Sequence, residues 1–282
     1  MQTPFNIIDK GDNVLKSLEK LDYKIYVKII ELLSKNVDGG ILYLSNEDLA
    51  NIEDIIKGVL KNSDYGLFAQ NYYNLFDLLD KSIIAEQAKT NNLKVNELNK
   101  FWKGSVSNMG IRDRVKYDFL GEGFSKNFIN GIAEVVREQG FFNRTIKEAS
   151  EILQKKLVTE SAFKKYANNT ARDLLSQYDG AFNDEIKQKY DFKNIRYIGS
   201  LIETSRPFCS HIMDTYNGKL SIEQMENELD LFCPNGKPSQ VKIEFNDGLV
   251  KRGSGMIEGT KIENISKLRG GYGCRHRLLY VR

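Results

Sequence analysis

Apolar residues recur every three or four positions through the first two thirds of the chain. This spacing places them on one face of an α-helix, where they can be buried together. We predict one long amphipathic helix that ends before Gly39 and Gly40, and a second helix after these glycines. The two stripes are Val14, Leu18, Leu21, Ile25, Ile29 and Leu32, and then Leu49, Ile52, Ile56 and Val59.

Polar residues at two positions mark where helices should begin. Ser45 is followed by Glu47 and Asp48, and acidic side chains are favoured in the first turn of a helix. Thr145 and Glu148 have the spacing of a capping box, in which each side chain bonds the other's backbone N–H. The aromatic-rich stretch 65–88 is also helical in its spacing.

The stretch 90–123 has a less regular pattern than its neighbours. It contains an Asn-Asn pair at 91–92 and four glycines, at 104, 110, 121 and 123. Because glycine weakens helices, we predict a looser connecting region here. Its Trp102 is the chain's single tryptophan, and we interpret it as a packing anchor.

After about residue 190 the period changes from helical to alternating. Val241, Ile243 and Phe245 alternate with polar residues, and the turn signal Asn-Asp-Gly at 246–248 leads into a return strand. Residues 192–202 and 278–281 are also typical of strands. The fold class predicted is therefore α+β, with a mainly α-helical N-terminal domain over 1–190 and a small α+β module over 191–282.

The composition is that of an ordinary globular protein. Of the 282 residues 41% are hydrophobic and 28% charged, and no apolar run is long enough to span a membrane. The first 13 residues lack the basic start and apolar core of a secretory signal, so we expect synthesis in the cytoplasm.

The net charge of +3 does not by itself indicate a nucleic-acid ligand, but the C-terminus is basic. The last 19 residues carry no acid and five basic side chains: Lys267, Arg269, Arg275, Arg277 and Arg282. Such a terminus is either ordinary solvated surface or a contact for double-stranded DNA or an acidic partner.

Signatures of common enzymes are absent from the sequence. It contains no phosphate-binding loop, dinucleotide fingerprint, Gly-x-Ser-x-Gly elbow or His-Glu-x-x-His motif. With only two histidines, acid–base catalysis by histidine has few places to occur. We therefore predict that the chain is not an enzyme.

The two histidines each follow a cysteine by two positions, as Cys209 with His211 and Cys274 with His276. On a strand, residues i and i+2 point to the same face, so two such pairs could form a tetrahedral zinc site, with Cys233 as a substitute ligand. Alternatively, the cysteines are small buried groups and the histidines hydrogen-bonded structural residues. Both interpretations stay open, so no cofactor is certain and zinc is a possible one.

The same residues carry a family resemblance. Residues 196–219, RYIGSLIETSRPFCSHIMDTYNGK, and residues 269–281, RGGYGCRHRLLYV, resemble two ordered motifs of the head-morphogenesis, or minor head protein, family of tailed phages, of which the Mu F-like proteins are the type. The positions that match in the first stretch are Tyr197, Gly199, Ser200, Ser205, Arg206, Pro207, Phe208, Cys209, Gly218 and Lys219. Those in the second are Gly270, Gly271, Tyr272, Cys274, Arg275, His276 and Val281.

The resemblance implies a structural role rather than catalysis. Family members are minor virion components that associate with the portal protein, lie in the head interior or at its vertex, and can bind DNA. It implies that Arg206, Cys209, Cys274, Arg275 and His276 hold the module together. Two alternatives stay open: a DNA- or protein-binding protein with a zinc-stapled C-terminal module, and a toxin-like metal-dependent enzyme.

Overall fold

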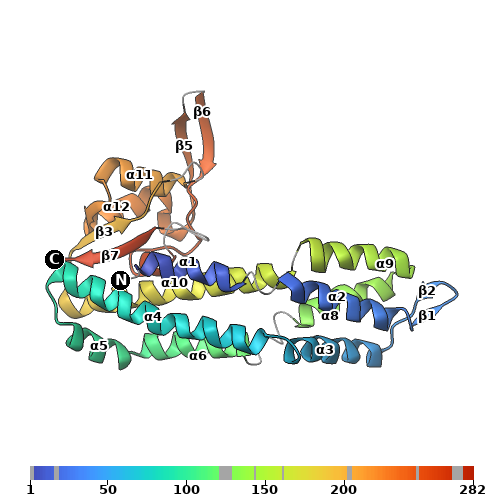
Figure 1. Ribbon diagram of the computed structural model, residues 1–282. Helices are drawn as coiled ribbons and strands as arrows, with labels where there is room; N and C mark the ends of the chain where they lie inside the picture. Colours follow the sequence, from blue (N-terminus) through green and yellow to red (C-terminus); the bar gives the residue numbers. More distant parts are fainter. Residues whose placement is uncertain are drawn as a thin grey trace. The chain divides into compact units, whose positions relative to one another are not determined.

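The computed structural model describes residues 3–15, 19–120, 129–142, 144–160, 162–201, 205–245, 248–268 and 276–282. These residues are mainly α-helical, with small antiparallel sheets that lie mostly near the C-terminus, which confirms the predicted α+β class (Figure 1). Among them, no helix combines the length and the apolar character that crossing a membrane requires.

The chain forms two compact units. Unit 1 comprises Met1–Ile8, Leu78–Ile111 and Asp173–Arg282, and unit 2 comprises Asp9–Asp77 and Arg112–Arg172. The predicted domain boundary at residue 190 falls inside unit 1, between a long helix and the first strand of the C-terminal sheet. Four helices contribute residues to both units: α1 (Pro4–Leu15), α4 (Tyr65–Asn91), α6 (Val106–Leu120) and α10 (Ala162–Tyr190).

The structure describes several helical elements wholly within unit 2, and the first two follow the predicted stripes. They are α2 (Glu19–Leu33), α3 (Asn46–Lys61), α8 (Asn130–Phe141), α9 (Ile146–Leu153) and the π-helical turn η3 (Gln154–Thr159). A two-residue hairpin, β1 (Val37–Asp38) with β2 (Ile41–Leu42), follows α2. Val14 of the first stripe lies in α1, and residues 16–18 between α1 and α2 are outside the described part of the chain.

Both predicted helix starts in unit 2 are confirmed. Ser45 caps α3, and its hydroxyl and the Asp48 carboxylate each accept the other's backbone N–H, at 3.2 and 2.8 Å. Thr145 and Glu148 make the same reciprocal pair at the start of α9. These bonds satisfy backbone donors that a helix end otherwise leaves without partners.

An aromatic cluster fills the core of unit 2. Tyr72 packs against Phe119 with ring centroids 4.9 Å apart, and its hydroxyl donates a 2.6 Å hydrogen bond to the Ala171 carbonyl. Phe68 also contacts Phe119, and Ile25 and Ile56 are fully buried. Aromatic burial of this kind stabilises helix packing beyond the area removed from water.

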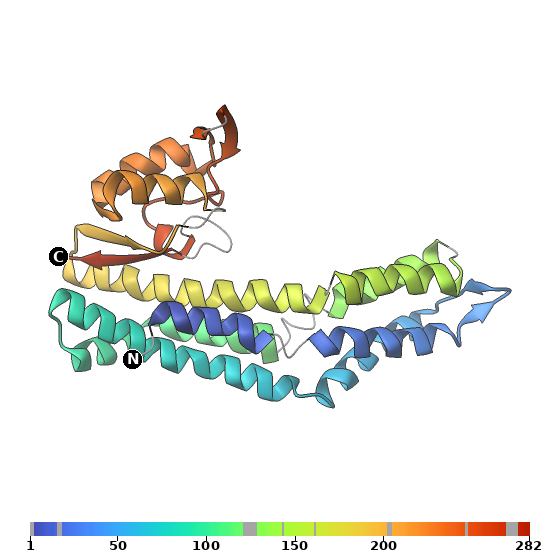
Figure 2. The same ribbon diagram turned by 45° about the horizontal axis from the view of Figure 1, so that its top comes forward.

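Unit 1 places a small sheet on helices. The sheet has the order β4–β3–β7 and consists of β3 (Asn194–Ile198), β4 (Lys219–Ser221) and β7 (Arg277–Val281), all antiparallel. In both views β3 and β7 lie between α10 on one side and α11 (Pro207–Tyr216) with α12 (Ile222–Phe232) on the other (Figures 1 and 2). β7 is covered on both faces, so its residues 277–280 are all buried.

The predicted hairpin near residue 245 is also present. β5 (Gln240–Phe245) pairs with β6 (Gly248–Gly253) in register from Gln240–Gly253 to Phe245–Gly248, and the turn residues 246–247 lie outside the described part of the chain. Unit 1 also contains two short elements, the 3-10 turn η4 (Pro234–Gly236) and α13 (Ile265–Leu268).

The prediction of a looser region over 90–123 is wrong for the residues that the structure describes. Residues 95–103 form α5 (Val95–Lys103), and residues 106–120 form α6. Gly104 lies at the C-cap of α5 rather than inside a helix, and Gly110 is accommodated within α6. Tertiary packing therefore overrides the weak local propensity, since Trp102 is fully buried against Tyr178 and Phe182.

Candidate functional site

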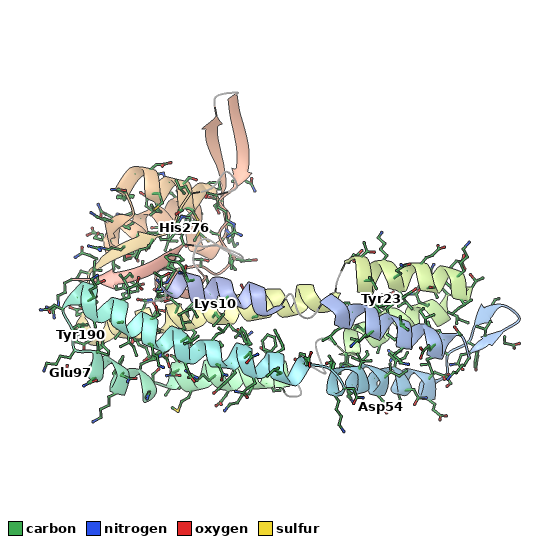
Figure 3. All side chains as sticks on the ribbon, in the orientation of Figure 1. Lys10, Tyr23, Asp54, Glu97, Tyr190 and His276 are labelled. Carbon is green, nitrogen blue, oxygen red and sulfur yellow. The ribbon has the colours of Figure 1, made fainter. Side chains whose placement is uncertain are left out.

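The two motif stretches meet through a row of aromatic contacts in unit 1. Starting from the residue before β7, each ring contacts the next, with centroids 5.0 to 6.0 Å apart. We call this the aromatic row, and it consists of His276, Tyr197, Phe208, Phe232 and His211. It joins strand β3 to helices α11 and α12 (Figure 3 labels His276).

Tyr197 is the centre of this row. Its ring stacks on the buried His276 ring at 5.0 Å and 7° between planes, and its hydroxyl lies 3.3 Å from the Cys209 sulfur. A side chain at Gly199 would place its Cβ 2.5 Å from the His276 ring, so only glycine allows this approach. Tyr197, Gly199, Cys209 and His276 therefore form one packed core.

Arg206 and Pro207 position α11 on this core. Arg206 is the N-cap residue with extended backbone, and Pro207 takes the first helical position, where a missing N–H costs nothing. The Arg206 side chain passes directly over Gly255, whose φ of +80° and contact with the Arg206 Cδ both exclude a larger residue. Arg206 and Pro207 thus fix the start of α11 beside Gly255.

His211 has partners on the other side of α11. Its Nε2 hydrogen-bonds Glu228 Oε2 at 2.7 Å, while the Tyr216 hydroxyl donates to Glu228 Oε1 at 2.5 Å. The bond to the Glu228 carboxylate raises the pKa of Tyr216. Glu228 is buried on α12, so this cluster ties α11 to α12 through charge-assisted hydrogen bonds.

The predicted pairing of Cys209 with His211 is wrong. The prediction placed both on a strand, but they lie on α11, where residues two apart point to nearly opposite sides. Cys209 faces Tyr197 and His211 faces Glu228. The two predicted histidine ligands, His276 and His211, lie at opposite ends of the aromatic row.

No other arrangement of described residues replaces that zinc set. Where the structure describes the chain, no three His, Cys, Asp or Glu side chains are grouped so that they could hold a metal ion. Cys233, the substitute ligand, is buried with its sulfur 3.8 Å from the Ile257 carbonyl, and burial raises the pKa of its thiol. Cys274 lies outside the described residues.

Arg277 was expected at a basic surface, and the structure corrects this. Only 1% of its side chain is exposed, and its guanidinium bonds both oxygens of Asp179 on α10, at 2.8 and 2.5 Å. It also lies 2.9 Å from Glu86 on α4 and 5.2 Å from the Phe5 ring on α1. A guanidinium enclosed in this way cannot contact DNA or a partner.

We call Arg277, Asp179 and Glu86 the buried ionic cluster. Burial by itself would lower the pKa of Arg277, but Asp179 and Glu86 raise it well above its usual value. Burial also raises the pKa of Glu86, with Arg277 opposing and Asp179 adding to that shift. The cluster holds two carboxylates for one guanidinium in a poorly solvated place.

A polar network that the sequence analysis missed continues from this cluster. Gln87 donates to Asn183 at 2.7 Å, and Asn183 in turn donates to the Asp179 carbonyl at 2.9 Å. Asn91 donates to the Tyr280 carbonyl, and the Arg282 backbone N–H donates to Asn91. The available signal was the i,i+4 spacing of Asp179 and Asn183 on α10, with the apolar residues Ala181 and Phe182 between them.

The other predicted contact residues are more scattered. Lys267 is partly exposed and lies 3.7 Å from Asp184, and Arg282 is exposed at the end of the chain. The predicted residues Arg269, Gly270, Gly271, Tyr272 and Arg275 lie outside the described part of the chain. The basic surface thus rests on fewer described side chains than the sequence indicated.

Comparison with known proteins assigns no family to this chain. No protein-family model, no curated protein and no solved structure matches this chain.

Proposed function

We propose that this chain is a structural minor head protein of a tailed phage that associates with the portal protein and acts in head assembly. The observation that carries the proposal is the pair of ordered sequence motifs at 196–219 and 269–281. The described motif residues support it because they pack against one another, with Tyr197 between Cys209 and His276.

A scaffolding role suits the chemistry of this core. Cys209 and His276 are buried and packed against Tyr197, and His211 is bonded to Glu228. The buried ionic cluster then joins β7 to α10 and α4 through Arg277. These described cysteine, histidine and charged side chains therefore join elements of the module to one another, which supports a structural role.

Purified virions test this proposal. The gene should lie beside genes for the portal protein and the large terminase subunit, and quantitative mass spectrometry should find the chain at far fewer copies than the major capsid protein. Co-expression of the full chain with the neighbouring portal protein should give a complex that survives size-exclusion chromatography.

A matched pair of variants tests whether incorporation into virions depends on the packing of the C-terminal module. Gly199→Leu would force a side chain into the His276 ring, whereas a Cβ at Gly66, on α4 in unit 2, meets open space. Incorporation into virions should be lost in Gly199→Leu and retained in Gly66→Leu. Absence of the wild-type chain from purified virions would overturn the proposal.

A further inference from the structure

A groove lies between α2 and α3 in unit 2, whereas the motifs of the C-terminal module belong to unit 1. Its volume is about 470 Å³, and the hydrophobic side chains that line it are Tyr23, Val27, Ile55 and Val59. Tyr23 is 57% exposed, which is unusual for a large aromatic residue (Figure 3). Exposed apolar surface of this kind, bordered by polar residues, is typical of binding sites.

The α3 side of the groove has the repeat of a helix-binding surface. Its lining residues run from Ile55 through Gly58 and Val59 to Asn62, at positions i, i+3, i+4 and i+7. These residues form one face over two helical turns, about 10 Å at 1.5 Å per residue. A groove between two helices with that length accepts the apolar face of a third helix.

The positive charge beside the groove favours a ligand helix that carries acidic side chains. Among the described residues that line it, the charged ones are Lys24 and Lys28 on α2, both exposed. Lys28 lies 2.7 Å from Glu31, but this pair is itself about half exposed and so is weakly held. Two cations beside an apolar surface favour a ligand whose apolar face is flanked by Asp or Glu.

We propose that this groove binds an acidic amphipathic helix of another protein. Leucine-type side chains spaced i, i+3 or i+4, i+7 would contact Val27, Ile55 and Val59, and flanking carboxylates would pair with Lys24 and Lys28. This binding site goes beyond the proposed function and does not depend on it, because its residues belong to α2, α3 and the C-cap of α3, and none of them is a motif residue.

Gly58 allows the groove to be filled without disturbing the fold. A Cβ at this position meets no atom within 4 Å, and its backbone is helical. Leucine at position 58 should therefore occupy the groove and, as a better helix former, keep α3 intact. Gly66→Leu is the matched control, since position 66 is also helical and open, lies in the same unit and does not line the groove.

The probe is a synthetic 14-residue helix with Leu on one face and Glu on both flanks, measured by fluorescence anisotropy with the full chain. We expect binding to the wild type and to Gly66→Leu, and affinity at least about tenfold weaker for Gly58→Leu, a loss of ~1.4 kcal/mol. A peptide with Lys in place of Glu should bind poorly. It should bind better to the Lys24→Glu/Lys28→Glu double variant, which reverses the charge of the groove.

Two results would overturn the proposal. One is equal binding of the Glu peptide to the wild type and to Gly58→Leu, which would place the contact elsewhere. The other is self-association of the wild-type chain in sedimentation velocity that Gly58→Leu abolishes, because the occupant would then be a second copy. Circular dichroism of each variant confirms that the helical content is unchanged.

Discussion

In unit 2 the interior is built mainly from aliphatic and aromatic side chains, whereas unit 1 encloses an ion cluster and a chain of amides. Among buried polar residues that the structure describes, Asp22, Asp118 and Gln139 belong to unit 2 and the rest to unit 1. The apolar core of unit 2 tolerates many arrangements of similar volume, but buried polar groups accept only partners that satisfy their hydrogen bonds. The buried polar groups of unit 1 thus favour a single packing arrangement, because breaking their hydrogen bonds and ion pairs costs stability.

The largest effect should come from removing the charge of Arg277. Arg277→Met keeps most of the side-chain volume but leaves the buried Asp179 and the partly buried Glu86 without their cation, at a cost of about 3–5 kcal/mol. Urea unfolding followed by the fluorescence of Trp102, which reports only on unit 1, should show a much lower midpoint.

Arg196→Met is the control for this substitution. Arg196 lies on the neighbouring strand β3 and is exposed, so its loss should change stability by less than about 0.5 kcal/mol. If Arg196→Met and Arg277→Met lower the urea midpoint equally, the stability of unit 1 does not depend on its buried charges. A helical signal that persists after the Trp102 transition would show that unit 2 stays folded.

A smaller loss of stability is expected at Gly199, which follows β3 and lies against the His276 ring. Gly199→Ala would place a methyl group 2.5 Å from the His276 ring and force the ring off Tyr197, at a cost of about 1–3 kcal/mol. Gly66→Ala in unit 2 should be neutral or slightly stabilising, because its Cβ meets open space. Thermal unfolding of the two variants measures the contrast, and equal melting temperatures would refute the close packing.

The smallest effect should appear as a pH dependence at Glu86. Because burial raises its pKa in the folded state above the ordinary 4.5, ionising this carboxyl costs stability as pH rises from 4.5 through the folded-state pKa. Glu86→Gln removes this titration, so the stability of the variant minus that of the wild type should increase with pH over that range and then level off. Urea unfolding of both proteins at a series of pH values measures this difference.

Glu97→Gln is the control for the substitution itself. Glu97 is exposed on α5 beside the exposed Lys94 (Figure 3). Its loss should change stability by less than about 0.5 kcal/mol. A stability difference for Glu86→Gln that does not change with pH would show that the Glu86 carboxyl is solvated rather than enclosed.

Local signals in the sequence predicted the elements well where packing agrees with them. The capping residues Ser45 and Thr145 mark the starts of α3 and α9, alternation marks β5, and residues typical of strands mark β7. The same signals failed over the described part of 90–123, because Gly104 lies at a helix end and Gly110 is accommodated within α6. The motif residues of the candidate site were visible in the sequence, but their contacts were not.

The sequence by itself determined the α+β class and the helical and alternating periods, and it singled out four of the five residues of the aromatic row, all but Phe232. Only the tertiary structure decided that Cys209 and His211 face different neighbours and that Arg277 is enclosed by Asp179 and Glu86. The physical reason is distance along the chain. A period reports on neighbours three or four residues away, whereas Arg277 meets a carboxylate 98 residues earlier, and that meeting depends on how every intervening element packs.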